Sequence, residues 1–175
     1  MSGILVAGIG NIFHGDDGFG VEVAQRMGRR ELPPQVKVTD FGIRGLDLIY
    51  ALAGNYRAVI LVDAAQTGEA PGTLSIIEPE PDEDAAANPA ALSGHNLDPA
   101  TILRLLPLVG AGTRRVLLVA CEPLDLGGEY GAIGLSAPVA AAVEPAINTI
   151  EQIVRDILAE ERSDAAPHAV EIHSG

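Results

Sequence analysis

The stretch Ile4-Leu5-Val6-Ala7-Gly8-Ile9-Gly10-Asn11 is an apolar run that is closed by a glycine turn. Such a run is typical of a buried β-strand that stops at a turn. From Phe19 onward the apolar residues are spaced by one helical turn, with Phe19, Val23 and Met27 four residues apart. This spacing predicts an amphipathic helix directly after the first strand.

The alternation of strands and helices continues along the chain. Further apolar runs predict strands at residues 36–40, 58–63, 73–77 and 116–121, and helices at residues 46–52, at residues 98–108 and from Ser136 onward. Pro145 lies inside the last helix and is expected to kink it. Residues 78–92 are rich in Glu, Asp, Pro and Ala and are expected to form a loop.

Strands that alternate with helices are typical of an α/β fold. We therefore predict a three-layer α/β/α sandwich with a mainly parallel, twisted sheet of about five strands. A chain of 175 residues has the size of one domain. We expect that domain to cover residues 1–161 and a flexible tail to cover residues 162–175, where the sequence has no periodicity.

The composition excludes several classes of protein. The chain carries 24 Asp and Glu against 11 Lys and Arg, a formal net charge of −13 at pH 7. This charge offers little to bind the phosphates of nucleic acids or an anionic membrane. A single cysteine can form neither an internal disulfide nor a cysteine-rich metal cluster. No apolar stretch reaches the ~18–20 residues of a membrane span. Because no basic residue precedes Arg26 to begin a signal peptide, we expect a cytoplasmic protein.

Polar residues stand where predicted strands end, which is where parallel α/β sheets bind ligands. Asp16 and Asp17 follow the first strand, Asp63 ends the third, and His95 precedes the helix predicted at residues 98–108. Two carboxylates and an imidazole suit a divalent first-row metal that keeps positions open for water or substrate. The nearby helix start favours a neutral His95, which is the form that binds metals.

Structural roles for the same residues stay open. Asp17 could cap the helix that begins near Gly18, and His95 could be a hydrogen-bonded loop residue. Asp63 is harder to explain in this way, because a buried strand seldom ends in a carboxylate without a partner. His14 is near enough in the sequence to replace Asp16 as ligand or base.

Two other kinds of enzyme share parts of this pattern. Gly8-x-Gly10 after the first strand, with Asp40 after the second, is typical of a dinucleotide site, but Phe13 replaces the third glycine of that fingerprint. Cys121 ends a strand and could act as a nucleophile with His95. A lone cysteine in an apolar run is more often a core residue.

Together the motifs resemble the nickel–iron hydrogenase maturation proteases, with matches spread in order over residues 3–160. The main matching motifs are Gly8-Ile9-Gly10-Asn11-Ile12-x-x-x-Asp16-Asp17-Gly18-x-Gly20-Val21, Val62-Asp63-Ala64, Pro71-Gly72-Thr73, Ser93-x-His95-x-Leu97, Glu122-Pro123 and Gly134-Leu135-Ser136-x-Pro138-Val139.

This resemblance implies an endopeptidase that removes the C-terminal extension from the precursor of a [NiFe] hydrogenase large subunit. Asp17, Asp63 and His95 match the family's metal-binding residues and are expected to hold nickel that the precursor already carries. Asp17 or Asp16 is then the candidate catalytic base. We expect the precursor to be the partner and the free protein to be monomeric. The alternative is a non-hydrolytic factor that senses nickel or binds the precursor.

Overall fold

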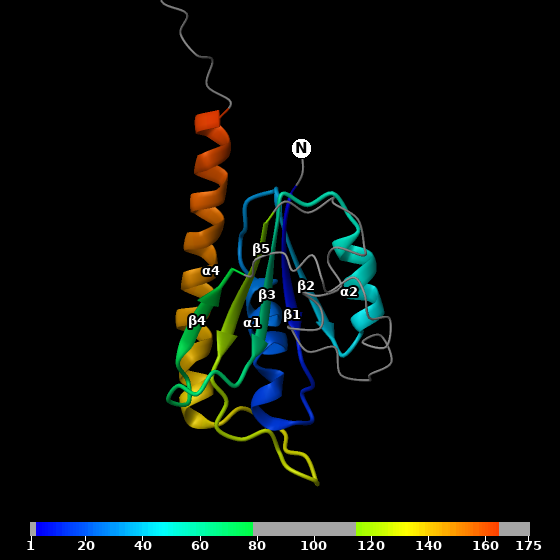
Figure 1. Cartoon of the computed structure of the whole chain (residues 1–175), viewed down its shortest axis with the longest axis vertical. Helices are drawn as coiled ribbons and strands as arrows, with labels where there is room; N and C mark the ends of the chain where they lie inside the picture. Colours follow the sequence, from blue (N-terminus) through cyan, green and yellow to red (C-terminus); the bar gives the residue numbers. More distant parts are fainter. Residues whose placement is uncertain (1–2, 79–114, 165–175) are drawn as a thin grey trace, which may run out of the picture.

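The computed structural model describes residues 3–78 and 115–164, which form a five-stranded sheet with helices on both faces (Figure 1). The sheet has the order β2-β1-β3-β5-β4, and all neighbouring strands are parallel except β4, which pairs antiparallel with β5 at one edge. The predicted, mainly parallel sheet is therefore confirmed. The strands are β1 (Ile4–Ile9), β2 (Val36–Gly42), β3 (Ala58–Ala64), β4 (Leu74–Ile77) and β5 (Arg115–Cys121).

The helices lie in two layers. Helices α1 (Phe19–Met27) and α4 (Ala137–Asp164) cover one face of the sheet, and α2 (Gly45–Leu52) covers the other (Figure 1). Successive residues of a strand point to opposite faces. Along β1, Ile4 and Val6 therefore join the core beneath α1 and α4, whereas Leu5 and Ala7 join the core beneath α2. This arrangement confirms the three-layer sandwich.

Some predicted segments fall outside the described residues. They are the loop beyond Glu78, the helix at residues 98–108 and the part of the tail beyond Asp164. Within the ranges 3–78 and 115–164, no helix combines the length and the apolar character that crossing a membrane requires.

Strand β1 occupies the point at which the chain changes direction across the sheet. After β1 the chain passes through the 3-10 helix η1 (Gly15–Gly18) and α1 to β2, and it then returns through α2 to β3 on the other side of β1. Because β1 and β3 pair in parallel, their carboxyl ends lie side by side. Open α/β sheets bind their ligands in the crevice at such a switch point.

Helix α4 runs to Asp164, past the predicted start of the tail at residue 162 (Figure 1). It continues as one helix through Pro145, and the kink expected there stays a prediction. Pro145 is exposed, whereas Val143 and Ile147 are fully buried against the sheet. Packing of this apolar stripe holds the helix together around the proline. The last turns need no such packing, because Ala, Glu and Arg have high helix propensity.

The start of α1 lies very close to the sheet. A Cβ added at Gly20 would overlap the carbonyl oxygens of Val62 on β3 and Ile9 on β1. A Cβ added at Gly8 would overlap the carbonyl oxygen of Gly20 from the sheet side. Glycine at both positions allows the helix to approach the strand ends so closely. This approach brings the residues that follow β1 to the end of β3.

We predict that Gly20→Ala lowers the free energy of unfolding by about 2–3 kcal/mol, because the added methyl group forces α1 away from both strands. Gly28→Ala, at the end of the same helix, is the matched control, since the nearest atom to its added Cβ is the Ala24 carbonyl oxygen at 3.3 Å. Urea unfolding followed by circular dichroism measures both variants. Equal losses of stability in the two would contradict the close-packing argument.

Candidate active site

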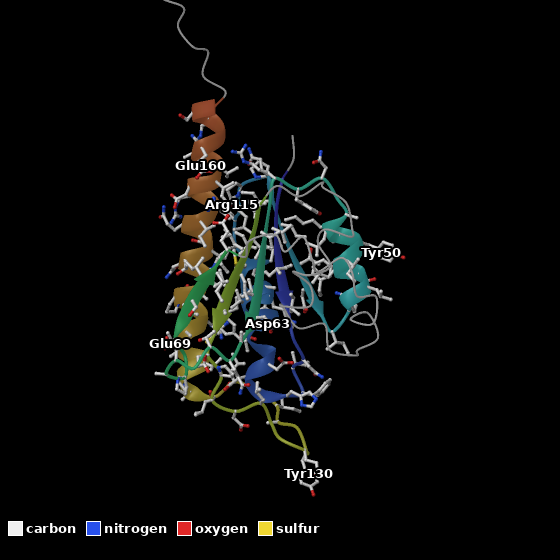
Figure 2. The ribbon with its side chains drawn as sticks, viewed as in Figure 1. Tyr50, Asp63, Glu69, Arg115, Tyr130 and Glu160 are labelled. Carbon is white, nitrogen blue, oxygen red and sulfur yellow. The ribbon has the colours of Figure 1, made fainter. Side chains whose placement is uncertain are left out.

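The turn after β1 and the end of β3 bring two of the predicted site residues, Asp17 and Asp63, to the same glycine. Gly10 has a φ of 131°, which L residues rarely adopt. A Cβ at this position would overlap the carbonyl oxygen of Asp17 and would lie 3.4 Å from Oδ1 of Asp63. Figure 2 shows Asp63 near the carboxyl ends of the central strands. The backbone of Asp17 and the carboxylate of Asp63 therefore both lie beside Gly10, at the edge of the sheet where a ligand is expected.

Asp17 is the half-buried acid of this pair. Its Oδ2 accepts a hydrogen bond from the backbone N–H of Asn11 at 2.8 Å, which closes the turn after β1. The alternative role of Asp17 as a helix cap is wrong, because Gly18 occupies the N-cap position of α1 and no side chain caps that helix. Among the described residues, Oδ1 of Asp17 accepts no hydrogen bond. Within that part of the chain, no donor competes with a ligand for this oxygen.

Asp63 is the buried acid of the pair, with 4% of its surface exposed. It lies in β3 opposite Ala120 of β5, and its Oδ1 accepts a hydrogen bond from the N–H of Ala64 at 2.8 Å. Burying a carboxylate costs free energy unless donors or a cation compensate for the lost water. Asp63 thus places a buried carboxylate at the ligand-binding edge of the sheet.

Asp16 points into the protein and is fully buried. Its Oδ2 accepts hydrogen bonds from the N–H groups of Leu124 and Asp125 and from the hydroxyl of Ser136, each at 2.8 Å. Its Oδ1 accepts a bond from the N–H of Ser136 at 2.7 Å. These donors belong to the loop between β5 and α4, so the carboxylate joins that loop to the turn that carries Asp17.

These contacts also set the charge of Asp16. Burial acts to raise its pKa, but the hydrogen bonds from Asp125, Ser136 and Leu124 outweigh burial and hold the pKa below its ordinary value. A buried carboxylate with four donors and a low pKa is a poor general base. The geometry thus favours a structural role for Asp16 over the predicted role as base. Ser136 directly precedes α4, and its hydroxyl donates to Asp16.

Glu122 is a buried acid whose role was not predicted from the residues. Its Oε2 accepts hydrogen bonds from the backbone N–H of Thr67 at 2.6 Å and from the Thr67 hydroxyl at 2.7 Å. These bonds, the backbone one first, hold the pKa of Glu122 below its ordinary value. Glu122 therefore fixes the loop that follows Asp63. The sequence feature that could have identified Glu122 is the same as for Asp63: an acid at the end of a buried apolar run.

The two alternative enzyme chemistries find no support in the geometry. Cys121 is fully buried, and burial, followed by the charges of Asp16 and Glu122, raises its pKa to about 11. A thiol with this pKa is a poor nucleophile at neutral pH. Asp40, the candidate ribose acid of a dinucleotide site, accepts a hydrogen bond from Gln25 of α1 at 3.1 Å.

Two of the three predicted metal-binding residues can be placed. Asp63 lies beside Gly10 and Asp17 bonds to Asn11, both at the switch point, whereas His95 lies outside the described residues. Within residues 3–78 and 115–164, no three metal-binding side chains lie together. His14, the alternative to Asp16, is exposed in the turn after β1, and its backbone forms a bridge to Ala132.

We predict that Asp16→Asn lowers the free energy of unfolding by about 2–4 kcal/mol at pH 7, because the amide keeps one acceptor oxygen for four donors. The pKa of Asp16 is lower in the folded than in the unfolded state, so its carboxylate stabilises the fold above about pH 4. This stabilisation is lost as the pH falls through the folded pKa. Urea unfolding should therefore show a smaller difference between variant and wild type at pH 3 than at pH 7.

The matched control is Asp17→Asn, which keeps an acceptor oxygen for the single bond from Asn11. We expect it to cost about 1 kcal/mol or less. A loss as large as that of Asp16→Asn, or a difference that does not change with pH, would contradict the structural role of Asp16.

Comparison with known proteins gives the family. A family model described as hydrogenase maturation protease matches residues 21–153, a range that contains Asp63 and His95 and begins after Asp17. The hydrogenase 2 maturation protease of Escherichia coli K12 is 31% identical over 154 residues, which cover 87% of this chain and 91% of the relative. The hydrogenase expression/formation protein HupD of Rhizobium leguminosarum bv. viciae is 33% identical over 155 residues, which cover 87% and 74%.

A solved structure agrees with these relatives. The hydrogenase maturating endopeptidase HybD from Escherichia coli matches with a TM-score of 0.68 and 30% identity, over 88% of this chain and 93% of HybD. The family model covers more than half of the chain, and the relatives cover nearly all of it. The chain therefore belongs to the hydrogenase maturation protease family.

Proposed function

We propose that this protein is the endopeptidase that removes the C-terminal extension from the nickel-loaded precursor of a [NiFe] hydrogenase large subunit. The observation that carries the proposal is that the backbone of Asp17 and the carboxylate of Asp63 both lie beside Gly10, while the carboxylate of Asp17 bonds to the adjacent Asn11, at the switch point between β1 and β3. The names of the relatives support the substrate class. One is a hydrogenase 2 maturation protease, and a structure from Thermococcus kodakarensis that is 25% identical is named a [NiFe] hydrogenase maturation protease.

In this proposal the nickel belongs to the substrate. Asp17, Asp63 and His95 bind the nickel that the precursor carries, with two oxygens and one nitrogen as ligands. Asp63 is held in place by its strand, and Asp17 by its hydrogen bond to Asn11. Binding of the metal positions the C-terminal segment of the precursor at the edge of the sheet and turns a weak encounter into an oriented one.

Peptide hydrolysis needs an activated water and a proton for the leaving amine. Nickel, as a divalent cation in the substrate, can polarise the scissile carbonyl or lower the pKa of a bound water. Asp17 is the acid with an oxygen available for proton transfer. Its Oδ1 takes a proton from the attacking water and passes it to the amine nitrogen as the C–N bond breaks. Asp16 supports this chemistry by holding the turn in place.

The second candidate is a maturation factor that senses nickel or binds the precursor without cutting it. This candidate rests on the same two carboxylates, because a pair of acids that binds a metal need not activate water. It predicts a stable complex with a precursor whose mass does not change. Mass spectrometry of the precursor therefore separates the two candidates.

We predict that the protein shortens a nickel-loaded large-subunit precursor and leaves the nickel-free precursor intact, because the protein recognises the substrate by binding its nickel. Purified protein is incubated with both forms, and their masses are compared over time. Equal cleavage of the two forms would contradict the role of nickel. Cleavage of neither form would favour the non-hydrolytic alternative.

We predict that Asp63→Asn lowers the processing rate by about 100-fold or more, because it removes one negative ligand of the substrate's nickel. His95→Ala is expected to have the same effect. Asp63→Asn keeps an acceptor oxygen for the N–H of Ala64, so the free energy of unfolding should change by about 1 kcal/mol or less. Rates and urea unfolding are measured on the same preparations.

Asp156→Asn is the control, since it removes one negative charge from an exposed position of α4. It should process the precursor at the wild-type rate. A folded Asp63→Asn variant with wild-type activity would rule out Asp63 as a ligand, and a variant that fails to fold would assign it a structural role.

A further inference from the structure

The loop between β5 and α4 exposes large apolar side chains near the candidate active site. Tyr130 is 97% exposed and Ile133 is 85% exposed, and Figure 2 shows Tyr130 at the tip of this loop, beyond the carboxyl ends of the strands. The turn after β1 adds Phe13, which is 60% exposed. We call these exposed apolar residues the docking surface, which consists of Ile12, Phe13, Leu124, Leu126, Tyr130 and Ile133.

The two segments of the docking surface are joined by their backbones. The N–H of Ala132 donates to the carbonyl oxygen of Phe13 at 2.9 Å, and the N–H of Gly15 donates to the carbonyl oxygen of Ala132 at 2.8 Å. The carboxylate of Asp16 adds its bonds to the same loop. The backbone that carries these exposed apolar side chains is thus held in place before any partner arrives. Binding to them therefore costs less conformational entropy than binding to an unfixed loop.

The docking surface is continuous with the candidate active site. Ile12 and Phe13 belong to the turn that Asp17 closes through its bond to Asn11. A protein bound to these side chains therefore lies next to Asp17. Large apolar side chains that are exposed together on neighbouring segments of a folded protein are typical of sites of interaction.

The charges around the docking surface narrow the choice of partner. Residues 11–17 and 124–136 contain four acids, Asp16, Asp17, Asp125 and Glu129, and no Lys or Arg. Two copies of this surface would bring like charges together, which disfavours pairing with itself. A partner with apolar side chains flanked by Lys or Arg matches both its apolar character and its charge.

We infer that the docking surface binds an apolar face of the hydrogenase large-subunit precursor that is flanked by Lys or Arg, and so recognises the precursor separately from its nickel. The inference rests on the proposed function and assigns to that site a second point of contact with the same substrate. Metal binding positions the segment to be cut, and the docking surface selects the protein that carries it.

The test is a double variant, Phe13→Ser with Ile133→Ser, assayed over a range of concentrations of nickel-loaded precursor. We expect KM to rise about tenfold or more, because apolar contacts at the centre of an interface carry much of the binding energy. We expect kcat to stay within about twofold, because neither side chain contacts the reacting atoms. An unchanged KM in a folded double variant would overturn the inference.

The matched control is Leu46→Ser with Tyr50→Ser, which removes two side chains of similar exposure from α2. It should leave KM at the wild-type value. A rise in KM only for this control would place the contact on α2 and overturn the inference. A wild-type dimer in sedimentation that the docking-surface variant abolishes would also overturn it, by making a second copy the occupant.

Glu129→Lys tests the charge of the partner. We expect KM to rise severalfold at low salt and the effect to shrink at high salt, as for a pair of opposite charges near the surface. A fall in KM would show an acidic partner face and would overturn that part of the inference.

Binding of the precursor is also measured directly by sedimentation. If the wild type binds but does not cut, the proposed function fails, while the comparison of the variants still decides the docking surface.

Discussion

The site depends on one buried interaction, the set of hydrogen bonds that the carboxylate of Asp16 accepts. Three backbone N–H groups and one hydroxyl converge on this side chain from the loop before α4. Hydrogen bonds to a charged acceptor are stronger than neutral ones, and burial strengthens them further. Without the carboxylate, these donors would lack a partner and the loop would keep only its backbone bonds to the turn after β1. The turn that carries Asp17, the exposed loop and the start of α4 are therefore positioned by the same group.

The local geometry of η1 explains why two adjacent acids have different surroundings. Asp16 and Asp17 both lie in this 3-10 helix, which has three residues per turn. Neighbouring side chains then point about 120° apart, so one can face the interior while the next faces the edge of the sheet. Asp16 is fully buried, and Asp17 is half-buried beside Gly10. The acid that points to the interior fixes the loop before α4, and its neighbour stays partly accessible beside Gly10.

The two acids at the ends of the central strands, Asp63 and Glu122, also have different surroundings. Asp63 in β3 lies beside Gly10, whereas Glu122 after β5 binds Thr67 and fixes the loop that follows Asp63. Both acids follow buried apolar runs, and both are shielded from solvent. They differ in the groups that their carboxylates contact. Glu122 joins its strand to a loop that lies 55 residues earlier in the chain, whereas Oδ1 of Asp63 accepts a bond from the neighbouring residue Ala64.

Much of the fold could be predicted from the sequence, because it depends on local patterns. Continuous apolar runs predict strands that are covered on both faces, and the spacing of Phe19, Val23 and Met27 predicts α1. The rule that ligands bind at the carboxyl ends of parallel strands was enough to select Asp16, Asp17 and Asp63 as candidates. The path of α4 through Pro145 could not be predicted in this way, since it depends on packing against a distant sheet.

The sequence by itself determined the alternation of strands and helices, the residues of the core and the group of acids at the strand ends, because each of these follows from the order of apolar and polar residues. The tertiary structure decided which of these acids is buried and which groups each carboxylate contacts. The donors to Asp16 lie more than one hundred residues away in the chain, and Gly10 joins Asp17 to Asp63 only once β1 and β3 are paired. Contacts between segments so far apart leave no local pattern, so they become visible only when the chain is folded.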